Sequence, residues 1–140
     1  MILSGIRSRL AADSGVSALV AANRIFIGMA ARQVARPYVV LHGINLPPAE
    51  TTLDGSSALR DGEFQFDSYA DNAVDARKLS NLVQAALEDF GGTLDDGSPP
   101  DGSTIQFVGV TADGDDSFEV AGSSFIYRTF FRIKAFYTEA

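Results

Sequence analysis

The chain has no cysteine, no tryptophan and a single histidine, His42. Without cysteine, disulfide bonds and thiolate metal sites are excluded, and a reducing cytoplasm suits such a composition. A general base needs a hydrogen-bond partner within reach. No partner for His42 can be identified in the sequence, and the residue falls in an apolar segment, so we interpret it as structural.

Long apolar runs are also missing. None approaches the roughly 20 residues that a membrane-spanning helix needs. The apolar N-terminus is interrupted by Arg7, Arg9 and Asp13, which a signal peptide would not tolerate. We therefore expect mature structure from the first residues onward and no contact with a membrane.

No motif for a metal, a cofactor or catalysis is present. A calcium loop of the EF-hand type that began at Asp113 would need glycine at its sixth position and glutamate at its twelfth, where Phe118 and Ser124 stand. The glycine pairs lack the lysine or third glycine of a phosphate-binding loop. We predict no cofactor, no metal and no enzymatic activity, with a looser calcium site and a small carboxylate enzyme as alternatives.

Charge is distributed unevenly along this acidic chain, whose net charge is −7. Residues 1–36 hold five arginines and one acid, whereas residues 79–127 hold nine acids and neither lysine nor arginine. Phosphate binding needs clustered cations, so tight binding of nucleic acid is not expected. The asymmetry instead favours head-to-tail contacts between copies.

The length of 140 residues suits one domain, which we place over residues 1–140. Apolar residues recur at helical spacing from Ile2 to Leu10. Residues 38–44 and 63–69 are expected to be strands, the first central and the second half-buried. A helix is predicted from Asn72 to Phe90, with Asn72 as its N-cap and Gly91-Gly92 as its stop.

The remaining segments complete an α+β domain. Residues 45–60 and 93–103 are predicted loops by composition. A strand over 105–111, a tight reversal at 112–116 and a returning strand near 118–120 precede a final strand over 125–137. The predicted fold is a mostly antiparallel sheet with one long helix packed on a face and an N-terminal helix beside it.

Two sets of charged residues are candidate assembly sites. The acidic set is expected in mobile loops that serve assembly or line a channel; it comprises Asp95, Asp96, Asp101, Asp113, Asp115, Asp116 and Glu119. The basic set is a candidate inter-subunit face; it comprises Arg24, Arg32, Arg36, Arg128, Arg132 and Lys134. Alternatives for the basic stripe on the final strand are single-stranded nucleic acid, solvent, or cover by the N-terminal helix.

The order of these segments and the kinds of residue within them resemble those of a known family. The residues that carry the resemblance are Asn23-Arg24-Ile25-Phe26, Arg36-Pro37-Tyr38-Val39-Val40-Leu41, Phe64-Gln65-Phe66-Asp67-Ser68-Tyr69 and Ala76-Arg77-Lys78-Leu79. They are similar to the tail-completion or tail-terminator proteins of long-tailed bacteriophages over about residues 1–90.

The resemblance implies a structural virion protein without catalysis or cofactor. It implies a ring, typically hexameric, that caps the tail tube and docks to the head connector, with host cytoplasm as the place of assembly. DNA would pass through such a ring without specific binding, because an acidic lumen repels phosphate. A neck or head-closure protein and a monomeric α+β binding module with an acidic loop are the alternatives.

Overall fold

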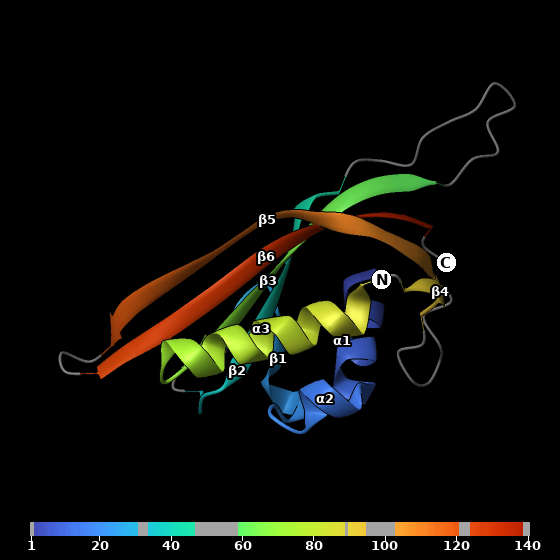
Figure 1. The fold of residues 1–140 in the computed structure, drawn as a ribbon. Coiled ribbons are helices and arrows are strands. Elements are labelled where there is room, and N and C mark those ends of the chain that lie inside the picture. Colours follow the sequence, from blue (N-terminus) through green and yellow to red (C-terminus); the bar gives the residue numbers. More distant parts are fainter. Residues whose placement is uncertain are drawn as a thin grey trace, which may run out of the picture.

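The structure is a computed structural model that describes residues 2–30, 34–46, 59–88, 90–94, 103–120 and 124–138. Six strands form one curled sheet in the order β1-β2-β3-β6-β5-β4 (Figure 1). All neighbours are antiparallel except β1 and β2. The predicted α+β class with a mostly antiparallel sheet is therefore confirmed, and the sheet is mixed. The strands are β1 Ile25–Ile27, β2 Tyr38–Asn45, β3 Arg60–Ala70, β4 Gly91–Thr93, β5 Thr104–Val120 and β6 Ser124–Thr138.

The helices lie on one face of this sheet (Figure 1). They are α1 Ile2–Ala12, α2 Ser14–Ser17, the short 3-10 helix η1 Ala22–Arg24, and α3 Ala73–Leu87. None of them is long and apolar enough to cross a membrane. The predicted N-cap of α3 is confirmed, because the Asn72 side chain accepts a hydrogen bond of 2.9 Å from the backbone N–H of Asp75.

The predicted end of α3 is wrong by three residues. Glu88 already has an extended backbone, with ψ of 133°, so the helix stops at Leu87. The chain then enters the sheet, where the Phe90 carbonyl accepts a hydrogen bond from the Phe107 N–H. Gly91 and Gly92 belong to β4 and are not the helix stop.

The core lies between the helices and the inner face of the sheet. Strand β3 alternates as predicted, with Phe64 and Phe66 fully buried toward the helices. Phe66 stacks on Phe131 of β6, with ring centroids 5.1 Å apart. The helices complete this core with apolar residues that are less than 2% exposed: Ile2, Ile6, Leu10, Val16, Leu79, Val83 and Leu87.

The tight reversal predicted at 112–116 is absent, because these residues continue strand β5. The Asp113-Gly114 pair is a turn signal, but Gly114 lies directly opposite Phe130 on β6. A Cβ atom at Gly114 would lie 2.8 Å from the Phe130 ring. The glycine thus makes room for a cross-strand aromatic ring, and tertiary packing overrides the local turn preference.

We expect a Gly114→Ala variant to unfold with about 1–3 kcal/mol less free energy, because the added methyl group overpacks the Phe130 ring. Gly109→Ala on the same strand is the matched control, since its Cβ meets nothing within 4 Å. Chemical denaturation of both variants measures the difference. Equal stability of the two would show that the Phe130 ring moves aside without cost.

The β5–β6 hairpin extends beyond the rest of the sheet. Pairing of β3 with β6 ends at the Ala70–Tyr127 pair, whereas β5 and β6 stay paired as far as Val120 and Ser124. Phe125, which the alternation places on the core face, is 53% exposed because α3 and β3 do not reach it. Most of the predicted loop at 45–60, and the loop at 93–103 apart from its first two residues and Ser103, lie outside the described residues.

Candidate assembly surfaces

The acidic candidates separate into those that the structure places and those that it does not. Asp95, Asp96 and Asp101 lie outside the described residues, and for Glu119 only the backbone, in β5, is described. Asp113, Asp115 and Asp116 lie on β5 rather than in a loop. The expectation that these three occupy a mobile loop is therefore wrong.

Two of these three aspartates are paired within the subunit. Asp115 accepts hydrogen bonds from Arg77 of α3 at 2.6 Å and from the Thr129 hydroxyl at 2.9 Å. These two hydrogen bonds lower the pKa of Asp115 below its ordinary value. Asp116 forms an ion pair with Arg128 across the hairpin. Asp113 is exposed and forms no ion pair with any residue that the structure describes.

The predicted basic stripe exists, and its members are also engaged. Arg128, Arg132 and Lys134 lie on the sheet face opposite the helices, so the alternative of cover by the N-terminal helix is wrong. Their partners are Asp116 for Arg128, the Gln65 side-chain oxygen at 2.8 Å for Arg132, and Asp61 at 3.2 Å for Lys134.

The other basic candidates are scattered near β1 and β2. Arg36 pairs with Asp71 at 2.5 Å, beside the cis peptide bond that joins it to Pro37. Arg24 donates a hydrogen bond of 3.4 Å to the Ala35 carbonyl. Arg32 lies outside the described residues. Of the described members of the basic set, two therefore lie beside β1 and β2 and three lie on β6.

A buried carboxylate, Asp67, lies on the sheet face opposite the helices, which we call the helix-free face. Asp67 is 2% exposed and contacts the His42 ring at 3.0 Å and the Gln65 amide at 2.8 Å. Burial alone would lower the pKa of Arg128, but its hydrogen bond to Asp116 and the charge of Asp67, 3.9 Å away, raise it above the ordinary value. The residues described include no group of three or more His, Asp or Glu that could hold a metal ion.

Sequence reasoning missed the Asp67–His42 pair. The alternation of β3 pointed Asp67 toward solvent, and only the register of β2 against β3 places His42 beside it, opposite Gln65. No nucleophilic side chain is paired with His42 among the described residues. The pair therefore joins two strands and supports the structural interpretation of His42.

A row of aromatic rings crosses the same face. Phe26, Tyr38, Tyr69 and Phe118 come from four strands, with centroids 6.2, 4.6 and 6.5 Å apart in that order. The guanidinium of Arg128 lies 5.3 Å from the Phe118 ring. Burial raises the pKa of both tyrosines. Tyr38 and Tyr69 are stacked, Phe26 meets Tyr38 edge-on, and Phe118 is tilted against Tyr69, so the row connects neighbouring strands.

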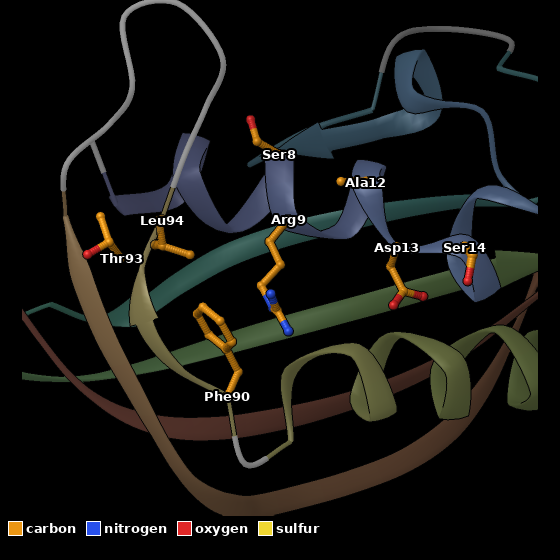
Figure 2. A pocket seen from close by; sticks show the side chains of 8 residues that line it. All are labelled: Ser8, Arg9, Ala12, Asp13, Ser14, Phe90, Thr93 and Leu94. Atoms are coloured by element: carbon orange, nitrogen blue, oxygen red, sulfur yellow. The ribbon is translucent and has the colours of Figure 1, made fainter.

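An open cavity of about 450 Å³ lies where α1 and α2 meet the segment that follows α3. Figure 2 shows Arg9 of α1 extending between the helices, with its guanidinium over the Phe90 ring at 3.5 Å. The Arg9 Nε donates a hydrogen bond of 3.1 Å to the Ala86 carbonyl in the last turn of α3. Burial lowers the pKa of Arg9, and nearby Asp13 opposes that shift.

Strand β5 has a long open edge. Strand β4 covers it only from Thr104 to Gln106. The Phe107 N–H is bonded to the Phe90 carbonyl, and beyond Phe107 the described residues provide no outer strand; the pairing with β6 shifts register after Phe107 and after Val110. Val108 is 57% and Val110 40% exposed. Unpaired backbone groups beside exposed valines are typical of a surface that another chain covers.

Comparison with known proteins agrees with the resemblance found in the sequence. The family model described as "Tail completion protein gp17" matches residues 4–135. A chain of the structure "Virion of native gene transfer agent (GTA) particle" has a TM-score of 0.57 at 19% identity, covering 96% of this chain and 92% of that one.

A second solved chain has a TM-score of 0.57 at 12% identity, with 99% of this chain and 93% of that one covered. No curated protein matches the chain. At these identities the two solved structures support the fold, and the family model supplies the identity. The chain belongs to the tail completion protein gp17 family and is a structural protein of bacteriophage tails.

Proposed function

We propose that this chain caps the tail tube as a ring, typically hexameric by family resemblance, and joins the tail to the head connector. The observation that carries the proposal is the family match over residues 4–135, which includes strands β1 to β5 and all but the last three residues of β6. The protein would act at the tail–head junction of the virion, after assembly in the host cytoplasm. Its role would be structural, without catalysis or cofactor.

Two different surfaces on one subunit support a ring. The open edge of β5 continues from β4 along the same side of the sheet, and its far end lies away from α1 and β4 (Figure 1). Contacts between unlike surfaces generate closed rings when the rotation between neighbours closes. A self-complementary dimer would instead need the same surface on both partners.

The charge of the chain suits passage of DNA. A net charge of −7 leaves a ring of several copies strongly acidic. A lumen lined by carboxylates repels phosphate, whereas a basic lumen would hold the duplex by releasing its counterions. The cations of the helix-free face are largely paired with acids or amides of the same subunit, which limits their use for gripping DNA.

The test is assembly of the purified chain, alone and with purified tail tubes. We expect a ring in analytical ultracentrifugation or electron microscopy, free or seated on the tube end, with weaker association as salt is raised. Chain that stays monomeric even in the presence of tubes counts against the proposal. Binding to the head connector without binding to tubes would favour the head-closure alternative. A monomer that binds a small ligand would favour the binding-module alternative.

A further inference from the structure

The Arg9 cavity has the chemistry of a carboxylate site. The Arg9 guanidinium is held in place on one side by the Phe90 ring and at Nε by the Ala86 carbonyl. Its two terminal nitrogens form no hydrogen bond within the part of the chain that the structure describes. A planar guanidinium that is already oriented binds a carboxylate through two parallel hydrogen bonds at small entropic cost.

The walls of the cavity are largely polar. Ser8, Ser14 and Thr93 line it together with Arg9 and Asp13, and the Ser8 hydroxyl is directed away from the guanidinium (Figure 2). Asp13 also lines the cavity and its charge acts on Arg9, so an incoming carboxylate shares the guanidinium with it; one Asp13 oxygen accepts the hydrogen bond from the Val16 N–H that caps α2. The volume of about 450 Å³ admits a side chain and part of its backbone.

The same subunit supplies a carboxylate that cannot reach this cavity. Asp113 is the β5 aspartate that has no ion pair among the described residues, whereas Asp115 and Asp116 are paired with arginines. Thr93 at the cavity faces Thr104 across the β4–β5 ladder. Asp113 lies nine residues further along β5, which is about 30 Å at the usual rise of a strand.

We propose that the Arg9 cavity of one copy binds Asp113 on the open β5 edge of a second copy. The exposed Val108 and Val110 precede Asp113 on that edge, so the contact joins an ion pair to buried apolar surface. Asp113 lies well away from the Arg9 cavity of its own subunit, and the two surfaces are different, so the contact is head-to-tail. This inference rests on the proposed ring and names the residues that join its subunits.

Charge reversal tests the pair. We expect Asp113→Arg and Arg9→Glu each to weaken self-association on the order of ten-fold or more, because each places like charges together in the contact. A mixture of the two variants should assemble again into alternating rings, because opposite charges then meet at every contact. The reversed cavity of the Arg9→Glu variant would receive the reversed edge of the Asp113→Arg variant. The next contact around the ring would join the unchanged Arg9 to the unchanged Asp113.

The outcomes separate this inference from the proposed function. If wild-type chain forms rings and Asp113→Arg forms them equally well, the pair is wrong and the ring stands. Loss of assembly in Asp95→Asn/Asp96→Asn but not in Asp113→Arg would also overturn the pair. If a thermal melt shows that Arg9→Glu is unfolded, the Arg9→Lys variant replaces it. We expect Arg9→Lys to fold and to assemble less tightly than wild type, because lysine cannot form the two parallel hydrogen bonds. Assembly of Arg9→Lys equal to wild type would also contradict the pair.

Discussion

A Phe66→Ala variant is expected to lose about 3–5 kcal/mol of unfolding free energy, the largest loss that we predict. Phe66 is 0% exposed at the centre of the sheet. Its ring lies nearly parallel to that of Phe131, with 15° between the planes. Truncation removes the buried ring and also this stacking contact, and the rigid strands on either side prevent the cavity from closing.

Denaturant unfolding of Phe66→Ala against Phe136→Ala measures this effect. Phe136 lies in the same sheet on the helix-free face and is 39% exposed, so its loss should cost much less. The Phe66→Ala/Phe131→Ala double variant completes a cycle that isolates the stacking energy. Similar losses from Phe66→Ala and Phe136→Ala would mean that the core does not lie between the sheet and the helices.

The second large effect is expected from Leu79→Ala, at about 2–5 kcal/mol. Leu79 is 0% exposed on the face of α3 that packs on β3 and β6. The helix is anchored at both ends, by the Asn72 cap and by the Arg9 hydrogen bond to Ala86. It therefore has little freedom to shift and fill the cavity that alanine would leave.

Val74→Ala is the matched control for Leu79→Ala. Val74 lies in the first turn of the same helix and is 76% exposed. Its replacement should change stability by about 0.5 kcal/mol or less, and alanine is the better helix former. Thermal melts of both variants give the comparison. A melting temperature unchanged by Leu79→Ala would show that the apolar stripe of α3 is not part of the core.

The predictions from sequence were best where one segment determined its own structure. The apolar period of α3 and the alternation of β3 were read correctly because each depends on neighbours three, four or two residues away. The Asn72 cap was read correctly for the same reason, since its bond reaches only to Asp75. These local patterns determined the α+β class and the family resemblance.

Errors arose where a distant residue decided the outcome. Asp113-Gly114 is a turn signal by itself, but Gly114 faces the Phe130 ring sixteen residues later, and the strand continues. Gly91-Gly92 is a helix stop by itself, but the chain had already turned at Glu88 to let Phe90 bond with Phe107.

The same distinction applies to the assembly surfaces. The sequence by itself determined that the chain is acidic, without thiols, and divided into a basic N-terminal part and an acidic later part. Only the tertiary structure decided that Asp115 and Asp116 are paired with arginines within the subunit, and that Asp113 has no such pair among the described residues. Ion pairs depend on which strands and helices lie side by side. The register of the strands is set by packing of the whole sheet, so it is not encoded in any one segment.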